Sequence, residues 1–391
     1  MSQRSTKPHL IWLYPGSLVH AMDAATWLDT TNELRKMGWR VTLVAAGPSG
    51  QQRIRGTDVF CIPRPKKYLV GLLVFHMRFL QFLRRHMMNV DIILFNQMSA
   101  LWLLPVRPLR GLAGRQGPLL VMDIRSLHMP REDNQGWKGW LRGKFQEFIN
   151  RSARHWIDGY LTITHRMSEA INIPPQKLWG EWPSGVNPDL FGPPRTARCW
   201  PLSEQPIHLV YIGALEYERN LMTLCQTVEK ANAEGMLFTL LLVGNGTERT
   251  DLELFAARCD GRIRVAHPVS YDEVPEILAW AHLGVLPFPD EEKFRVSSPI
   301  KLFEYMATGL PILATRIACH TDVIGSGKYV FWAERADISG ILAALRLVWM
   351  NRDALPKIGS QAAIAVQAWT WYESAKKLKQ SLEFGLSKSK K

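Results

Sequence analysis

Residues 295–315 read R-V-S-S-P-I-K-L-F-E-Y-M-A-T-G-L-P-I-L-A-T, and the rest of the chain can be interpreted around them. One of the two adjacent serines suits a helix N-cap, and Pro299 suits the first helical position, where its missing N–H costs nothing. Gly309 suits the left-handed residue just past a helix, and the proline after it prevents continuation. The stretch therefore predicts a helix over 298–308 and a short buried strand over 311–315.

Lys301 and Glu304 share one face of this predicted helix, because they lie three residues apart near its N-terminus. A helix N-terminus carries unpaired N–H groups and a partial positive charge, so a lysine beside it favours a phosphate. A glutamate one turn later can accept hydrogen bonds from sugar hydroxyls. The pair suits a nucleoside diphosphate, and the alternative is an ordinary capped helix whose charges point to water.

The composition is that of a globular chain of two or three domains. Its 391 residues are 47% hydrophobic and 21% charged. The five cysteines are scattered and form no C-x-x-C pair, so neither a zinc site nor a disulfide framework is indicated, and a reducing cytosol fits best. The N-terminus has no signal-peptide pattern, and the longest apolar run, Tyr68–Phe75, is far below the roughly 20 residues that span a bilayer. We therefore expect a cytoplasmic protein.

The net charge of +13 is concentrated in the first half of the chain. The first 192 residues hold 25 Lys/Arg against 13 Asp/Glu, whereas the remainder holds 23 against 22. Between Asp58 and Asp123 the only acid is Asp91, among nine basic residues. Such a field attracts anionic lipid, nucleic acid or an anionic substrate, although a charge run is also common on a solvated face.

Strand and helix patterns alternate along the first half. Buried-strand patterns cover residues 9–15, 39–46, 58–62, 91–95, 119–124 and 160–164. Helical patterns cover residues 22–37, 68–88 and 137–156. The alternation predicts a parallel α/β sheet with right-handed crossovers.

A turn-rich connector over 183–195 separates this half from a second alternation of the same kind. Its strand patterns cover residues 207–212, 238–243, 263–266, 283–287 and 311–315. Its helical patterns cover residues 221–232, 250–258, 272–280, 298–308, 338–350 and 360–382. Two such doubly wound domains facing each other create a cleft, and ligands bind outside the carboxyl ends of the strands.

Five short motifs follow one another along the chain. They are P-S-G-V-N at 183–187 with Phe191, Y-I-G-A-L at 211–215 with E-R-N-L at 218–221, V-G-N-G at 243–246, S-P-I-K-L-F-E-Y-M-A-T-G-L-P at 298–311, and T-W-Y at 370–372. In this order they resemble the motifs of GT-B glycosyltransferases, specifically the large retaining family numbered four.

The resemblance implies two Rossmann-like domains with a C-terminal helix that crosses back to the first. We expect an acceptor-side domain at 1–190 completed by a helix at about 367–385, a nucleotide-sugar domain at 195–366, and a basic, disordered tail at 386–391. The implied reaction is a retaining, metal-independent transfer from a nucleotide-diphosphate sugar, with UDP- or GDP-sugars favoured and no bound cofactor. The implied acceptor is a hydroxyl of a glycan or lipid-linked molecule, in cell-surface polysaccharide or glycolipid synthesis.

The resemblance also implies site residues. Glu304 is expected to bind the ribose hydroxyls, while Lys301 and Arg219 neutralise the diphosphate. Charge builds on the departing phosphate, so preorganised donors meet the physical need. Backbone groups that assist at the phosphates or read the base are expected at Gly16, Gly213, Val269, Ser298 and Ile300.

Three departures from the family pattern limit these expectations. Val296 stands eight residues before Glu304, where the commoner pattern has a glutamate that contacts the donor sugar, so the sugar stays open. Only Gly16 remains of the usual Gly-Gly after the first strand. Ala214 stands where the family has a basic residue, which leaves Arg219 to carry that charge.

The acceptor is expected on the N-terminal domain. Residues 123–128, D-I-R-S-L-H, follow a predicted strand and therefore project from its carboxyl end. Arg125 suits an acceptor phosphate, Ser126 lies on the same side, and His128 suits an acceptor hydroxyl as a further catalytic candidate. The alternatives are a surface histidine with no role and an Asp123 that caps a turn.

The basic segment over 64–115 then has a use, since the resemblance implies acceptors on anionic membranes. We expect peripheral attachment to the cytoplasmic face of a membrane through the helix at 68–88, where each Lys/Arg contributes about 1 kcal/mol. On a helical wheel the polar and apolar residues separate: Arg78, Gln81 and Arg85 lie opposite Leu69, Leu72, Leu73, Phe79, Leu80 and Leu83.

Other functions remain open at this point. A nucleotide-sugar epimerase or hydrolase of the same fold keeps the diphosphate site without an acceptor, and a non-catalytic GT-B partner is compatible with Val296. An NAD-dependent dehydrogenase is disfavoured because no G-x-G-x-x-G follows an early strand. A nucleic-acid-binding module accounts for the basic half, but no recognised motif supports it, so no nucleic-acid partner is expected.

Overall fold

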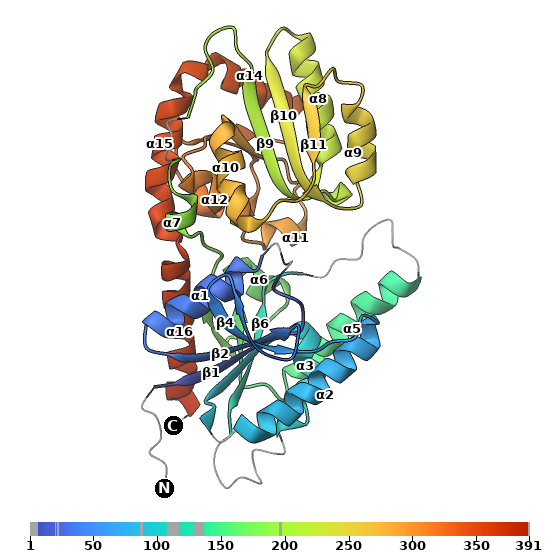
Figure 1. The fold of residues 1–391 in the computed structure, drawn as a ribbon, viewed down its shortest axis with the longest axis vertical. Helices are drawn as coiled ribbons and strands as arrows, with labels where there is room; N and C mark the ends of the chain where they lie inside the picture. Colours follow the sequence, from blue (N-terminus) through green and yellow to red (C-terminus); the bar gives the residue numbers. More distant parts are fainter. Residues whose placement is uncertain are drawn as a thin grey trace. The chain divides into compact units, whose positions relative to one another are not determined.

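The computed structural model describes residues 7–19, 21, 23–86, 89–107, 117–127, 137–194 and 198–389, with the backbone alone at 137–143 and 146. The chain folds into two compact units, of which one comprises Met1–Ser184 with Trp371–Lys391 and the other Gly185–Thr370 (Figure 1). Each unit is built on its own sheet. The predicted class, two doubly wound α/β domains, is confirmed.

The N-terminal sheet has eight strands in the described part of the chain, in the order β3-β4-β2-β1-β5-β6-β7-β8. The strands are β1 (His9–Tyr14), β2 (Arg40–Ala46), β3 (Gly50–Ile54), β4 (Thr57–Ile62), β5 (Ile92–Asn96), β6 (Leu119–Ile124), β7 (Gly159–Thr162) and β8 (Leu178–Glu181). All neighbours pair in parallel except β3 with β4. The strand order reverses between β1 and β5, which makes this the switch point of the sheet.

Two edge strands of this sheet were not predicted. The polar run G-Q-Q-R-I of β3 lacks a buried face, and it pairs with β4 through a turn in which Arg55 and Gly56 have φ of 46° and 76°. Strand β8 reads L-W-G-E and is only four residues long. Neighbouring strands, rather than a hydrophobic pattern of their own, hold both in place.

The helices of the N-terminal unit are α1 (Ala25–Lys36), α2 (Tyr68–His86), α3 (Ala100–Leu103), α5 (Trp137–Ala153), α6 (His165–Ala170) and α16 (Trp371–Ser389), with the 3-10 turn η2 (Gln97–Ser99). Helix α2 buries a face that includes Leu72, Phe75 and Phe79. Leu69 and Leu73, which the helical wheel groups with that apolar face, are exposed at 73% and 45%. The apolar face of α2 is therefore wider than the face that the unit covers.

Helix α16 belongs to the N-terminal unit, where it packs against α1 and β8 (Figure 1). Two glycines permit this close packing. A Cβ at Gly385 would lie 2.3 Å from the Trp179 ring, and one at Gly180 would lie 2.1 Å from the Ser381 hydroxyl. The helix continues to Ser389, so the prediction of a disordered tail from residue 386 is wrong over its described part.

The C-terminal sheet is parallel throughout its described part, in the order β11-β10-β9-β12-β13-β14. Its strands are β9 (Ile207–Ala214), β10 (Phe238–Asn245), β11 (Ile263–Ala266), β12 (Leu283–Leu286), β13 (Ile312–Thr315) and β14 (Val330–Ala333). The order reverses between β9 and β12. The carboxyl ends of these two strands are therefore where a ligand is expected in a sheet of this type.

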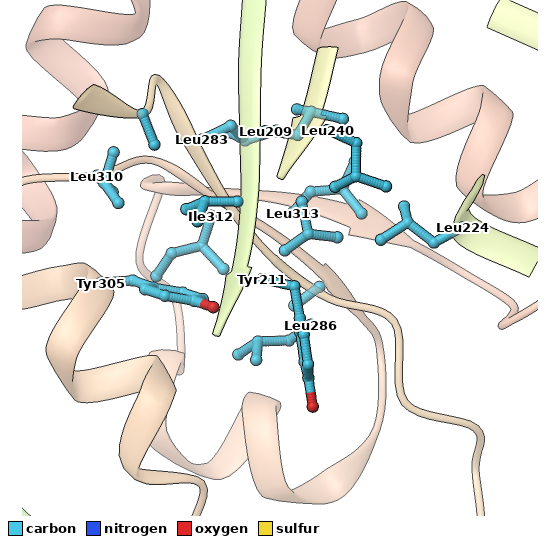
Figure 2. Close-up of a cluster of buried hydrophobic side chains, with 14 of the residues drawn as sticks. Leu209, Tyr211, Leu224, Leu240, Leu283, Leu286, Tyr305, Leu310, Ile312 and Leu313 are labelled. Atoms are coloured by element: carbon cyan, nitrogen blue, oxygen red, sulfur yellow. The ribbon is translucent and has the colours of Figure 1, made fainter. Parts of the chain in front are cut away.

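The core of the C-terminal unit gathers leucine and isoleucine side chains from neighbouring strands (Figure 2). Leu209, Leu240 and Leu283 come from three adjacent strands and are at most 1% exposed. The unit's helices and 3-10 turns are α7 (Pro188–Phe191), η4 (Tyr217–Arg219), α8 (Leu221–Ala233), α9 (Arg249–Ala256), η5 (Tyr271–Glu273), α10 (Val274–Trp280), α11 (Glu292–Arg295), α12 (Ile300–Ala307), α13 (Ala318–Ile324), α14 (Ile338–Met350), η6 (Arg352–Ala354), α15 (Leu355–Ala365) and η7 (Val366–Trp369).

Two local predictions for this unit are wrong. Helix α12 begins at Ile300 with Pro299 as its N-cap, and neither preceding serine caps it; the Ser297 hydroxyl instead donates to the carbonyl of Phe294. The helix predicted over 360–382 is two helices, because the backbone at Thr370 is extended between α15 and α16. Gly309 has φ of 67° after α12, as predicted.

Candidate functional site

Glu304 on α12 is a buried carboxylate, and one of its two oxygens has no hydrogen-bond partner in the described structure. Its side chain is 0% exposed, and Oε2 accepts a hydrogen bond of 2.9 Å from Nζ of Lys301. Oε1 is buried and has no hydrogen-bond partner within the described structure. An unsatisfied buried carboxylate oxygen costs free energy, and such costs are found where a ligand completes the bonding. The alternative in which both charges point to water is therefore excluded for Glu304.

Tyr305 fixes the helix that carries this pair. Its hydroxyl accepts a hydrogen bond of 3.2 Å from the backbone N–H of Ile212 in β9, and its ring lies beside that strand (Figure 2). A Cβ at Gly284 of β12 would lie 2.3 Å from the Tyr305 ring, so only glycine leaves room for it. Helix α12 is thus anchored at the two strands where the sheet order reverses.

The carboxyl ends of β9 and β10 approach each other so closely that they require glycine. A Cβ at Gly244 would lie 1.8 Å from the carbonyl oxygen of Gly213, and one at Gly246 would lie 2.1 Å from that of Leu215. Gly213 itself has φ of 157°, close to extended backbone. The glycine turns of the sequence motifs therefore shape the carboxyl edge of the sheet at β9 and β10, beside its switch point.

Arg219 ends the turn η4 that follows β9, and aromatic rings hold it. Its guanidinium carbon lies 4.9 Å from the centroid of Phe288 and 5.1 Å from that of Phe294, and these two rings stack on each other at 4.9 Å. The described residues provide it with no carboxylate partner. A half-buried guanidinium that is stacked but not neutralised suits an anionic ligand.

Asn220 was not predicted as a site residue, yet it positions Arg219. It adopts the left-handed conformation with φ of 61°, and its Nδ2 donates to the carbonyls of Pro287 at 3.0 Å and Ala336 at 2.6 Å. These bonds connect the Arg219 turn to the residue after β12 and to the segment between β14 and α14. The signal in the sequence was an asparagine directly after the arginine, since asparagine tolerates this backbone conformation.

The remaining predicted residues of this unit lie in the segments that follow β11 and β12. Ser298 is buried and Ile300 is half-buried at the start of α12, where helix N–H groups lack intrahelical partners. Val269 is partly buried in the loop after β11. Val296, in place of the family's glutamate, is 3% exposed at the end of α11.

The N-terminal unit has its own buried cluster at the carboxyl end of β6. Oδ1 of Asp123 accepts a 3.0 Å hydrogen bond from the Trp182 indole, so Asp123 does not cap a turn. Burial raises the pKa of Asp123 to about 6. Arg125 stacks over the Trp182 ring at 3.7 Å and donates to the Trp182 carbonyl at 3.2 Å and to Oγ of Ser184 at 3.4 Å. Burial lowers the pKa of Arg125 to about 10, which still leaves it charged at neutral pH.

The other predicted site residues of this unit are Gly16, Ser126 and His128. Gly16 follows β1, and a Cβ there would lie 2.8 Å from the Tyr14 ring. Ser126 is exposed directly after Arg125. His128 lies outside the described residues, so its predicted role is not addressed by the structure.

Two features are absent from the described residues. They contain no group of three or more His, Cys, Asp or Glu side chains arranged to hold a metal ion. None of the helices among them has the length and apolar character needed to cross a bilayer.

Two family models match successive parts of the chain. Residues 24–177 match the model described as "Glycosyl transferase 4-like domain", and residues 206–351 match "Glycosyl transferases group 1". The matched ranges fall in the N-terminal and C-terminal units, respectively.

Solved structures share the fold over nearly the whole chain. Sucrose-phosphate synthase from Thermosynechococcus elongatus aligns with a TM-score of 0.74 at 17% identity, over 96% of this chain and 98% of that one. The catalytic domain of starch synthase IV from Arabidopsis thaliana, bound to ADP and acarbose, aligns with 0.71 at 11% identity, over 98% and 100%. Anabaena HepE in complex with UDP-glucose aligns with 0.67 at 12% identity, over 96% and 99%.

A curated relative matches a shorter part of the chain. Glycogen synthase from Mycobacterium tuberculosis is 24% identical over 222 residues, which are 54% of this chain and 50% of the relative. The chain thus spans about half the length of the curated relatives it matches. With both family models in order and the shared fold, the chain belongs to the GT-B glycosyltransferases of the group 1, family 4 type.

Proposed function

We propose that this chain transfers a sugar from a nucleotide-diphosphate sugar to a hydroxyl of a glycan or lipid-linked acceptor, with retention of anomeric configuration and without a metal ion. The observation that carries the proposal is the buried Glu304 carboxylate, with Oε2 held by Lys301 and Oε1 without a partner. We place the reaction in cell-surface polysaccharide or glycolipid synthesis, on the cytoplasmic side.

The donor is held by the C-terminal unit in this proposal. Glu304 accepts hydrogen bonds from the ribose hydroxyls, and Oε1 is the oxygen available for them. Lys301 and Arg219 neutralise the diphosphate, together with backbone N–H groups at Ser298, Ile300 and Gly213. The backbone at Val269 contacts the base.

The chemistry follows from where charge develops. As the bond between the sugar and the diphosphate oxygen breaks, the sugar gains oxocarbenium character and negative charge grows on the leaving phosphate. Arg219, fixed by Phe288 and Phe294, can stabilise that charge with little reorganisation. Cationic side chains thus supply the neutralisation that a metal ion supplies in other transferases.

The acceptor is held by the N-terminal unit in this proposal. Stacking on Trp182 fixes Arg125, and its remaining N–H groups bind an acceptor phosphate or hydroxyl. Ser126 and His128 complete the acceptor side, with His128 orienting the attacking hydroxyl.

A panel of UDP-, GDP- and ADP-sugars tests the donor site by thermal stabilisation. Relatives in complex with UDP-glucose and with ADP make these bases the first choice. A ligand at 100 times its Kd adds roughly 2.7 kcal/mol to the free energy of unfolding. The Glu304→Ala and Lys301→Ala variants should lose this shift, and a shift that survives both substitutions would refute the site.

We further propose that helix α2 attaches the N-terminal unit to an anionic membrane surface. The exposed apolar side chains of α2 recur at helical spacing: Leu69, Leu73 and Met77 are 73%, 45% and 53% exposed, with Val70 at 49% beside them. Arg84 and Arg85 follow at the exposed C-terminal end of the helix. Apolar insertion and cationic attraction together are the features of interfacial helices.

Co-sedimentation with vesicles of defined anionic lipid content tests this attachment. We expect Leu69→Ser with Leu73→Ser to reduce binding at every lipid composition, and Arg84→Gln with Arg85→Gln to reduce it on anionic vesicles. The matched control is Leu347→Ser, which is 45% exposed on α14 of the other unit. Binding that is equal on neutral and anionic vesicles, or unchanged in the variants, would contradict the proposal.

A further inference from the structure

Four flat side chains stack in a column at the amino-terminal edge of the C-terminal sheet. The rings of Trp280 and His208 have centroids 4.4 Å apart and planes 14° from parallel. His208 and His282 stack at 4.7 Å and 20°, and His282 and Trp200 at 6.0 Å and 28°. His208 is the second residue of β9 and His282 directly precedes β12. The column therefore lies at the opposite strand ends from the glycine turns and Arg219.

Hydrogen bonds hold the two imidazoles in one arrangement. Nδ1 of His282 accepts from the backbone N–H of His208 at 3.0 Å, so its Nε2–H donates to the carbonyl of Cys199 at 2.7 Å. Nδ1 of His208 lies 2.7 Å from the Thr239 hydroxyl. Burial lowers the pKa of both rings, to about 4 for His282, so both are neutral at pH 7. The column is rigid and uncharged.

Two cavities border this column, and Trp280 and His208 line both. The larger cavity has a volume of about 510 Å³, and its lining includes Arg198, Cys199, Gln205, His208, Trp280 and His282. The smaller has about 250 Å³ and is also lined by Thr239 and Arg262. The Trp280 side chain is 45% exposed. A volume of 300–1,000 Å³ is typical of sites for small molecules, so the larger cavity is of the right size.

The larger cavity offers neutral polar groups rather than free charge. It has no carboxylate in its lining, and Arg198 uses its guanidinium in four hydrogen bonds to backbone carbonyls, of Ala279, Gly309, Leu278 and Thr308. Gln205 accepts from the Leu202 amide through Oε1, and its side-chain NH₂ has no partner within the described structure. A flat apolar wall with neutral donors and acceptors suits a ring that has an apolar face and hydroxyls at its rim.

We propose that this cavity binds a neutral oligosaccharide, with one sugar ring against Trp280 and hydroxyls on Gln205 and Nε2 of His208. The site is separate from the donor site, because the two lie at opposite ends of the strands. This proposal rests on the proposed function in one respect: the function is the reason for choosing a glycan, rather than another neutral polyol, as the ligand. Its use would be to hold a glycan chain on the enzyme while the donor is exchanged.

Titration of the full chain with short neutral oligosaccharides, followed by calorimetry and by saturation-transfer NMR, tests the site. The probes are maltoheptaose, cellopentaose and xylopentaose, with uridine as a flat-ring comparison. We expect at least one oligosaccharide to bind, Trp280→Ala to weaken it about tenfold or more, and Trp280→Phe to restore it to within about threefold. Gln205→Ala, at an exposed position, should weaken binding without loss of fold. The matched control is Phe384→Ala, a 50% exposed aromatic on α16.

The same titration in the Lys301→Ala and Glu304→Ala variants separates this site from the donor site. We expect oligosaccharide binding to be unchanged there, while stabilisation by nucleotide sugars is lost. No binding by any oligosaccharide, tighter binding of uridine than of the sugars in the Glu304→Ala variant, where the donor site is disabled, or binding that survives Trp280→Ala would overturn the proposal. A wild-type chain that binds oligosaccharide but no nucleotide sugar would refute the proposed function and leave the Trp280 site supported.

Discussion

Glu304 in the C-terminal unit and Asp123 in the N-terminal unit are both buried carboxylates with a cationic side chain close by. Lys301 occupies one oxygen of Glu304 and leaves Oε1 without a partner in the described structure. Asp123 instead accepts a hydrogen bond from the Trp182 indole, and the nearby Arg125 stacks on the ring of the same tryptophan. One cluster has bonding capacity left for a ligand, whereas the other is largely satisfied within its own unit.

A buried charge can stabilise the fold or bind a ligand, and the two clusters differ in this respect. A satisfied cluster stabilises a single local arrangement, and its removal is expected to affect folding first. A cluster with an unpaired acceptor has a free-energy cost that a bound donor group offsets, so its removal is expected to affect binding first. The substitutions below distinguish these uses, because each has a different readout for the two units.

Glu304→Ala should have the largest effect. In the proposed donor site it removes the acceptor of two ribose hydroxyls, and hydrogen bonds to a charged group contribute about 1.5–3 kcal/mol each, so kcat/KM should fall by about 10²–10⁴. Initial rates with the donor found by thermal stabilisation measure this. Glu276→Gln, an exposed glutamate on α10, is the control and should leave kcat/KM unchanged. An unaltered kcat/KM in Glu304→Ala would mean that the C-terminal cluster is also purely structural.

Arg219→Met should lower kcat by about 10²–10³, the usual cost of one donor that stabilises transition-state charge. The methionine can keep contact with Phe288 and Phe294 but cannot bind phosphate. Donor affinity should fall less than kcat, because the charge on the phosphate grows during the reaction. Steady-state kinetics with Arg258→Met as an exposed control measure the difference. A loss confined to thermal stability would assign Arg219 to packing.

Much of the donor side could be predicted from the sequence. Lys301 and Glu304 share a short helix, so their spacing alone places them together, as the 2.9 Å bond shows. The close approach of the Gly213 and Gly244 backbones and the stacking of Arg219 on Phe288 depend on residues that are distant in sequence. No local pattern encodes such contacts, which is why they required the structure.

The acceptor side and the edges of the fold were less predictable. The local sequence allows Asp123 to cap a turn, and it does not indicate the actual partner, Trp182, which lies 59 residues away. The strands β3, β8 and β14 are short, and tertiary contacts rather than periodicity stabilise them. The pattern over 360–382 predicts helix throughout, whereas the backbone at Thr370 is extended and separates α15 from α16.

Asp123→Asn should change stability rather than donor binding. The pKa of Asp123 is raised from 3.8 to about 6 in the folded state, so the folded protein binds its proton more tightly than the unfolded chain does. The wild type should therefore lose about 2–3 kcal/mol of stability as the pH rises from about 4 to about 6, with little further change above. Urea unfolding across this range measures the slope.

In Asp123→Asn this part of the slope should vanish, while the thermal shift with nucleotide sugar at pH 7 stays as in the wild type. Asp58→Asn, at an exposed position of β4, is the control and should keep the wild-type slope. An unchanged slope in Asp123→Asn would mean that the buried carboxylate is ionised over the whole range. A lost thermal shift would link Asp123 to the donor and remove the distinction between the two clusters.

Arg125→Lys should have the smallest effect of these substitutions. Lysine keeps the charge but loses the flat stacking on Trp182 and the fork that reaches both the Trp182 carbonyl and Ser184, so the free energy of unfolding should fall by about 1–2 kcal/mol. Donor affinity should not change, because the substitution leaves the C-terminal unit untouched. If Arg125 also binds the acceptor, KM for acceptor rises while KM for donor stays constant, and Arg40→Lys, at an exposed position of β2, changes neither. A donor affinity that falls together with stability would show that the two clusters act as one site.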